Sequence, residues 1–233
     1  MTLNEIREHL ERCAREQPML PSEHFKFDRY HDNPRYDGEV SLVTDPRYLP
    51  PLASLIATLK PSRMLTIGAL FGTLESYVLQ CCGGRSWSDS ITICDLDIPA
   101  YNANRDNGSL IYRNICGTQY GAYQRMFTHI FGSSMWPDVM HRIRACGPYD
   151  LIFIDGEHTH RAVYSDLDLA AETLAEDGTI LVHDTSLHSS GVPAGWTAWA
   201  NANNEHWRCH AVTDDVFLLG LGFAQRAPAL TEG

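Results

Sequence analysis

The feature that most constrains the fold of this chain is the segment of residues 149–185, in which two short apolar runs flank a helical pattern. The runs are Leu151–Ile154 and Thr179–Val182, and neither alternates between apolar and polar residues. Runs of this kind are typical of parallel strands that are covered on both faces. A strand, a helix and a second strand in this order predict a right-handed crossover, whose strands end at the same edge of one sheet.

The helix between the two runs is predicted from one apolar stripe at helical spacing. The stripe consists of Val163, Leu167, Ala170 and Leu174. Acidic residues are expected to lie largely off it, namely Asp166, Asp168, Glu172 and Glu176. We expect Gly178 to end the helix, because glycine readily adopts the left-handed conformation of a helix C-cap.

Ionisable side chains follow both apolar runs. Asp155, Glu157 and His158 come after the first, and His183 and Asp184 come after the second. The carboxyl ends of parallel strands border the ligand crevice of an open sheet, so these side chains are expected to converge there. The segment therefore predicts a functional site as well as a fold.

The chain length fits one α/β domain with an N-terminal extension. Of 233 residues, 44% are hydrophobic, which is enough for one full core and too little for two such domains with linkers. We expect residues 1–50 to hold a helix and a proline-rich segment, which is either a lid or an irregular surface strap. The main domain is expected in residues 51–224 and a frayed tail in residues 225–233.

Charge and cysteine content argue against several classes of protein. The formal net charge is −11, from 29 acidic and 18 Lys or Arg residues, and no basic run is present. Nucleic-acid and anionic-membrane partners are therefore not expected. No run of about 18 apolar residues is present, which argues against a membrane span. The seven cysteines lack C-x-x-C spacing and are expected to be reduced thiols, which predicts a cytoplasmic location.

Other elements are predicted on both sides of the crossover. Further strands are expected at Arg63–Ile67, Ile91–Cys94 and Phe127–Gly132, and an antiparallel hairpin at His206–Val212 and Val216–Gly222. Helices are expected over residues 3–16, 52–59, 73–82, 139–145 and 196–202. A T-x-x-E capping box, Thr2 with Glu5, supports the first helix.

A glycine-bounded turn, GALFG at residues 68–72, follows the first of these strands and precedes a predicted helix. Such a turn lets a ligand approach the backbone, although it can also be a plain connection. The second strand ends in Asp95, an acceptor for ribose hydroxyls. The third is followed by Ser133 and Ser134, where the edge of an adenine could sit.

Five segments together resemble the class I S-adenosylmethionine-dependent methyltransferases. They are MLTIGALFG, ITICDLD, HIFGSS, DLIFIDGEH and GTILVHD, within roughly residues 42–222. FIDGEH and LVHD are most similar to the small O-methyltransferases of the catechol and caffeoyl-CoA type, and to bacterial relatives that modify sugars and macrolides. The resemblance implies a Rossmann-like, doubly wound, mostly parallel seven-stranded sheet with an antiparallel C-terminal hairpin. It also implies an enzyme that uses S-adenosylmethionine to methylate a hydroxyl of a small molecule.

The resemblance assigns cofactor contacts to the strand ends. Gly68 and Gly72 would line the methionine part, Asp95 would hold the ribose, and Asp155 would face cofactor and acceptor. The other expected cofactor contacts are Ala69, Leu96, Ser133, Ser134 and Gly156.

The resemblance also implies a catalytic pair and a metal site. Asp155 and His158 would be catalytic, with His158 as general base, because a His that titrates near neutrality can accept a hydroxyl proton. Asp155, Asp184 and His183 would hold Mg²⁺, which prefers oxygen ligands and would lower the pKa of the acceptor hydroxyl.

The chain departs from the family pattern near the glycine turn. Thr66 stands where an acidic residue is usual, and Leu74 where a small hydroxyl residue is common. The methionine part of the cofactor then loses expected partners, for which Glu75 or the N-terminal segment would have to compensate.

Two other functions are compatible with the sequence. Thr66 and Leu74 are also consistent with a degenerate cofactor-binding protein that serves as a partner subunit. A metal-dependent hydrolase could be built on His158, His160, His183 and Asp184. The acceptor cannot be named from the sequence, and a homodimer is one assembly open to the chain.

Overall fold

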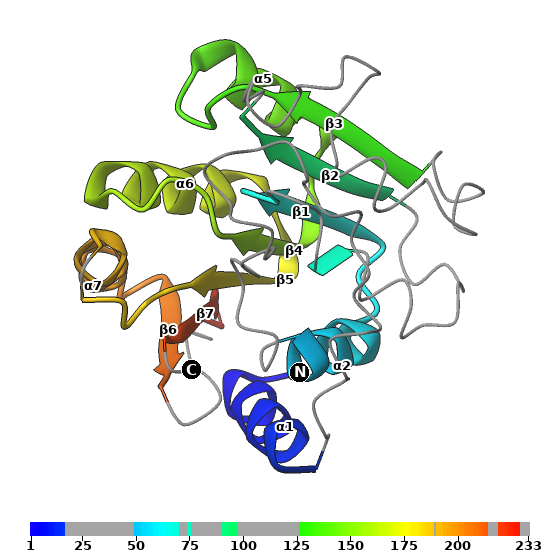
Figure 1. Ribbon diagram of the computed structural model, residues 1–233, viewed down its shortest axis with the longest axis vertical. Coiled ribbons are helices and arrows are strands. Elements are labelled where there is room, and N and C mark those ends of the chain that lie inside the picture. The colour runs from blue at the N-terminus through cyan, green and yellow to red at the C-terminus, as the bar shows by residue number, and fades with distance from the viewer. Residues whose placement is uncertain are drawn as a thin grey trace, which may run out of the picture.

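The computed structural model describes residues 1–16, 49–69, 74–75, 90–96, 126–188, 190–213 and 219–228 (Figure 1). The strands of this part are β1 Arg63–Ile67, β2 Ser90–Asp95, β3 Phe127–Phe131, β4 Tyr149–Ile154, β5 Leu174–His183, β6 Trp207–Val212 and β7 Leu221–Arg226. The helices are α1 Leu3–Glu16, α2 Leu49–Leu59, α5 Pro137–Cys146, α6 His160–Thr173 and α7 Val192–Ala202.

The strands form one seven-stranded sheet in the order β3-β2-β1-β4-β5-β7-β6. The first five are parallel, and β7 pairs antiparallel with both β5 and β6. This confirms the predicted Rossmann-like sheet with an antiparallel edge. Because β1 lies between β2 and β4, the chain reverses direction across the sheet at β1 and β4, which is where open α/β sheets bind ligands.

Both faces of the sheet are covered, which explains the continuous apolar runs. Ile152 and Ile154 of β4 belong to one buried cluster, which also contains side chains of α5, α6 and α7. Leu151 and Phe153 point to the other face and join a cluster with side chains of α1 and α2. In Figure 1 the helices α1 and α2 lie side by side, as do α6 and α7.

The N-terminal helix forms as the capping box predicts. The Thr2 N–H donates to Glu5 Oε2 at 2.7 Å, and the Glu5 N–H donates to Thr2 Oγ1 at 3.3 Å. Leu3, Ile6 and Leu10 are buried against the sheet cluster that also contains α2. No helix in the described part of the chain is both long and apolar enough to cross a membrane.

The prediction that Gly178 ends the helix is wrong. The helix α6 ends at Thr173, and Gly178 lies within β5 without a left-handed backbone. The Leu174 N–H closes the helix on the Ala170 carbonyl, and Leu174 then pairs with Tyr149 of β4. A Cβ on Gly178 would lie 2.7 Å from Leu174 Cγ and 3.1 Å from the Tyr149 carbonyl oxygen, so close packing explains the glycine.

The predicted hairpin is correct in kind and displaced in its second strand. The first strand was expected at His206–Val212 and forms as β6, whereas β7 runs from Leu221 to Arg226, beyond the predicted end at Gly222. Gln225 is therefore not part of a frayed tail: its side-chain amide donates to Thr179 Oγ1 of β5 at 2.9 Å. Two other expectations, the lid in residues 17–48 and most of the helix at 73–82, concern residues outside the described part of the chain.

Candidate active site

The ends of β1 and β4 are in direct contact at Gly68. Its φ of +83° is readily accessible to glycine, and its N–H donates to the Cys94 carbonyl of β2 at 2.9 Å. A Cβ at Gly68 would lie 2.1 Å from the Asp155 carbonyl oxygen, so no side chain fits between the two strand ends. The turn thus leaves bare backbone beside Asp155. Ala69 is half-buried beside it, and Gly72 lies outside the described residues.

The carboxylates of Asp155 and Asp184 share two histidines. His183 Nδ1 lies 3.3 Å from Asp155 Oδ1 and 2.9 Å from Asp184 Oδ1. His158 Nε2 lies 3.4 Å from Asp155 Oδ1 and 3.4 Å from Asp184 Oδ2. The structure therefore brings together the four residues to which the sequence analysis assigned catalysis and metal binding; we call them the Asp–His cluster.

The two histidines differ in exposure and in charge. The His183 side chain is 3% exposed, and although burial alone would lower its pKa, the two carboxylates raise the pKa to about 10. The His158 side chain is 39% exposed, and its hydrogen bond to Asp155 raises its pKa above the ordinary value. Burial would raise the pKa of Asp155, but the charges of His183 and His158 hold it below its ordinary value. His183 is thus a fixed cation, and His158 is the member that solvent or an acceptor can reach.

The backbone around the Asp–His cluster is held by specific contacts. Asp184 has a φ of +63°, an uncommon conformation for a residue other than glycine. Thr159, not His158, caps α6, because its side-chain oxygen accepts from the Ala162 N–H. The His158 carbonyl accepts from the Gly191 N–H at 2.8 Å, which ties this loop to the start of α7. His158 is therefore free to use its ring at the site.

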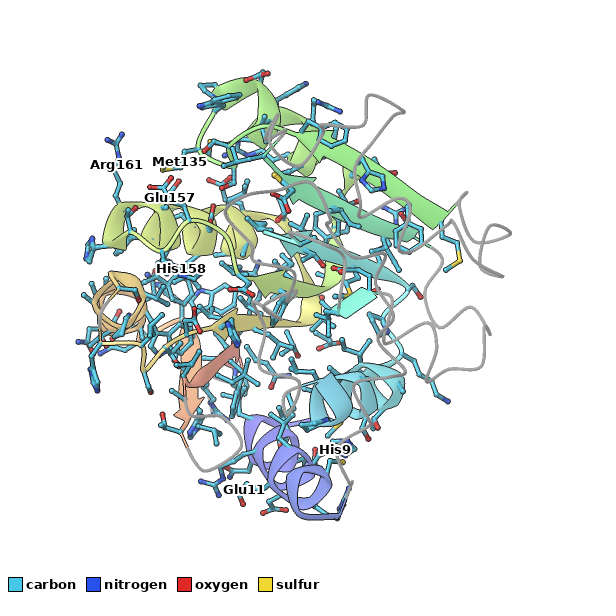
Figure 2. The ribbon with its side chains drawn as sticks, viewed as in Figure 1. His9, Glu11, Met135, Glu157, His158 and Arg161 are labelled. Carbon is cyan, nitrogen blue, oxygen red and sulfur yellow. The ribbon has the colours of Figure 1, made fainter. Side chains whose placement is uncertain are left out.

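The remaining predicted cofactor contacts lie at adjacent strand ends. Asp95 closes β2, and its carbonyl accepts from the Gly132 N–H after β3 at 2.9 Å. Leu96 is 48% exposed, and Ser133 begins the turn that leads into α5. In Figure 2, Glu157 and His158 lie near the strand tips, whereas His9 and Glu11 lie on the distant helix α1. The strand ends from β3 to β5 thus form one continuous edge.

Asp155, His158 and Asp184 each offer one possible metal ligand, and these atoms lie within 4.8 Å of one another. The sequence analysis expected His183 as the third ligand in place of His158. His160, which a hydrolase would use, is in no such group among the described residues; its ring stacks on Tyr164 at 6.3 Å between centroids. The geometry does not favour the hydrolase.

Two acidic side chains, Asp166 and Glu75, are buried beside the site. The burial of Asp166 contradicts the prediction from the sequence. Asp166 was expected off the apolar stripe but is 1% exposed, and burial raises its pKa to about 7. A Cβ on Gly156 would lie 3.4 Å from its Oδ2. Asp166 lies three residues after Val163 and one before Leu167, which places it on the buried face of the helix. This spacing is the sequence feature from which its burial could have been predicted. The second acid, Glu75, is buried with its neighbour Leu74.

The fold and the strand-end site define a class I methyltransferase. A family model described as a methyltransferase domain matches residues 65–185, more than half of the chain, so the chain belongs to this family. No curated protein matches the chain.

Solved structures share the fold at low sequence identity. An O-methyltransferase from Bacillus cereus in complex with SAH is 13% identical, with a TM-score of 0.62 over 97% of this chain and 92% of that chain. The O-methyltransferase TomG from Streptomyces achromogenes, in complex with SAM, is 12% identical, with a TM-score of 0.63 over 95% and 90%. The SAH-bound Podospora anserina methyltransferase PaMTH1 is 16% identical, with a TM-score of 0.60 over 98% and 97%.

Proposed function

We propose that this protein is an S-adenosylmethionine-dependent O-methyltransferase that acts on a hydroxyl of a small molecule. The observation that carries the proposal is the contact between the bare Gly68 turn and Asp155 of the Asp–His cluster. This contact places a backbone turn that can bind a cofactor next to a cluster of side chains that can transfer a proton. The family match supports methyl transfer, and the structural relatives named as O-methyltransferases support oxygen as the acceptor atom.

The residues at the strand ends suit the parts of S-adenosylmethionine. The Gly68 turn can accept the methionine part, because it carries no side chain and its backbone lies against Asp155 and Gly156 at the end of β4. Asp95 offers carboxylate oxygens to the ribose hydroxyls, and Ser133 and Ser134 offer hydroxyls at the adenine edge. Ala69, Leu96 and Gly156 would form the walls.

In the proposed reaction, the methyl group passes in line from the sulfonium to the acceptor oxygen. The protein aligns the two atoms, excludes water and removes the hydroxyl proton. His158 accepts that proton, since it is the exposed member of the Asp–His cluster. His183 stays charged and keeps Asp155 ionised and oriented toward His158.

In the alternative arrangement, Asp155, His158 and Asp184 would hold Mg²⁺, which would lower the pKa of the acceptor hydroxyl in place of proton uptake by His158, because a metal-bound His ring cannot also accept a proton. His183 already supplies one positive charge at Asp155 and Asp184, and Mg²⁺ would supply another. Measuring methyl transfer in EDTA and with added Mg²⁺ shows whether the reaction needs the metal. A metal-assisted enzyme loses most of its activity in EDTA, whereas one that depends on His183 alone keeps it.

The acceptor is proposed to be a small hydroxylated molecule, with no nucleic-acid or membrane partner. A cytoplasmic location follows from the expected reduced thiols, and a homodimer remains a prediction that sedimentation can check.

The proposal is tested by transfer of labelled methyl from S-adenosylmethionine to a panel of sugars, catechols and other hydroxylated compounds. Asp155→Ala is expected to abolish turnover while the protein stays folded. Asp177→Asn, which changes an exposed Asp on the neighbouring strand β5, is the matched control and should keep full activity. Near-normal transfer by Asp155→Ala, or wild-type protein that binds no S-adenosylhomocysteine in calorimetry, would contradict the proposal.

A further inference from the structure

Glu75 is a buried acid near the glycine turn, and no cationic side chain of the described residues pairs with it. Its side chain is 1% exposed, and neither carboxylate oxygen has a well-formed hydrogen bond within the described residues. The polar side chain with which it interacts is Thr66 of β1, whose hydroxyl partly opposes the rise in the pKa of Glu75. A carboxylate that is buried without a cation or a full set of donors is strongly destabilising, and the described residues supply neither to Glu75.

The surroundings of Glu75 add negative charge instead of positive charge. Burial raises its pKa to about 7, and the carboxylates of Asp95 and Asp155 add to the rise. These two residues end β2 and β4, and Thr66 lies on β1 two positions before Gly68. The Glu75 carboxyl therefore lies near enough to the ends of β1, β2 and β4 to interact with Thr66, Asp95 and Asp155.

A bound metal ion does not account for Glu75. The group of possible metal ligands among the described residues consists of Asp155, His158 and Asp184, and Glu75 is not a member of it. Hydroxyls and amides of a ligand would leave the negative charge uncompensated. The site therefore calls for an organic cation that carries several N–H donors and lies against the Gly68 turn.

We propose that Glu75, assisted by the Thr66 hydroxyl, binds the α-ammonium group of S-adenosylmethionine. This rests on the proposed function, in which the methionine part of the cofactor lies at the Gly68 turn. Asp95 and Asp155 are committed to the ribose and to the Asp–His cluster. The buried Asp166 interacts with Ser134 after β3, whereas Glu75 interacts with Thr66 of β1, two residues before the turn. An ammonium donates to both carboxylate oxygens and to Thr66, and each of these buried acceptors gains a partner.

Calorimetric titration with S-adenosylhomocysteine and with its analogue that lacks the α-amino group tests the assignment. Wild-type protein should bind the desamino analogue roughly 10- to 100-fold more weakly, the range expected for a hydrogen-bonded charge pair. Glu75→Gln should weaken binding of S-adenosylhomocysteine by a similar factor and change binding of the analogue less than twofold. Glu8→Gln, a change of an exposed acid on α1, is the control and should leave both affinities unchanged.

Two outcomes would overturn the proposal. Equal losses for the two ligands in Glu75→Gln would mean that Glu75 only supports the turn. Equal affinities of the wild-type protein for the two ligands would show that the ammonium has no ionic partner, whatever the variants do. If the wild-type protein bound neither ligand, the proposed function itself would fail, which is a distinguishable result.

Discussion

At the residue scale, the Asp–His cluster keeps the carboxylate of Asp155 ionised. Asp155 and Asp184 face each other across His183, whose Nδ1 contacts an oxygen of each. Without a cation, burial would raise the pKa of the Asp155 carboxyl, which would then need a proton. The imidazolium of His183 removes that need, since its pKa of about 10 keeps it charged through the neutral range. Asp155 is then available to His158 as a carboxylate.

His158→Gln should lower kcat/KM about 100-fold or more, the usual effect of losing a general base. In wild-type protein, kcat/KM should fall as the pH drops below the raised pKa of His158, because the protonated ring cannot accept a proton. The Gln variant should lack this dependence. His160→Gln, two residues away with its ring on Tyr164, is the control. A wild-type profile that is flat from pH 6 to 9 would rule out His158 as the base.

Asp166 gives a prediction about stability. Its pKa is near its ordinary value of 3.8 in the unfolded chain and about 7 in the folded protein, so the folded state loses stability relative to Asp166→Asn as the pH rises from 4 to 7. Above pH 7, Asp166→Asn should melt at least about 3 °C higher than wild type. At pH 4 the two proteins should melt together. Calorimetric scans check this; the same difference at both pH values would show that charge is not the cause.

At the element scale, strands were predictable where the sheet is covered on both faces. Arg63–Ile67 forms at the expected residues, because a parallel strand that is buried on both faces is mostly apolar, as Met64, Leu65 and Ile67 are. The second hairpin strand was misplaced, because the position of β7 depends on pairing with β5, a contact across the fold that no local pattern contains. Asp166 was missed for a related reason: its polarity suggested exposure, whereas its spacing placed it on the buried face of α6. The order of the strands itself was supplied by family resemblance.

Gly178→Ala tests the revised role of this glycine within β5. The added methyl group would meet Leu174 Cγ at 2.7 Å, so the variant should lose about 2 kcal/mol of unfolding free energy, as overpacked cores do. Part of that loss should disappear in a Leu174→Ala background, because the obstructing side chain is then shorter. Urea unfolding of the four proteins of this cycle measures the coupling. Strictly additive effects would contradict packing as the reason for the glycine.

At the scale of the whole molecule, two apolar clusters hold the helices on opposite faces of one sheet. One contains α5, α6 and α7, which lie next to the loops that carry His158 and Asp184. The other contains α1, α2 and the inner residues of β5 and β7. Met1 is tied to β7, since its carbonyl accepts from the Gln225 side chain at 2.9 Å. The N-terminal helix thus covers the face of the sheet opposite α6, although the sequence suggested an extension outside the main domain.

Ile6→Ala decides whether α1 belongs to the cooperative unit. Ile6 is fully buried, so the substitution should cost about 3 kcal/mol of global unfolding free energy and leave a single urea transition with an unchanged slope. Glu8→Ala changes an exposed residue of α1 that lies two positions after Ile6, and it should cost less than about 0.5 kcal/mol. If α1 were a detachable extension, Ile6→Ala would release the helix at low urea and leave the main transition where it is. Far-ultraviolet circular dichroism separates these cases, because a detached α1 adds an early loss of helical signal before the sheet unfolds.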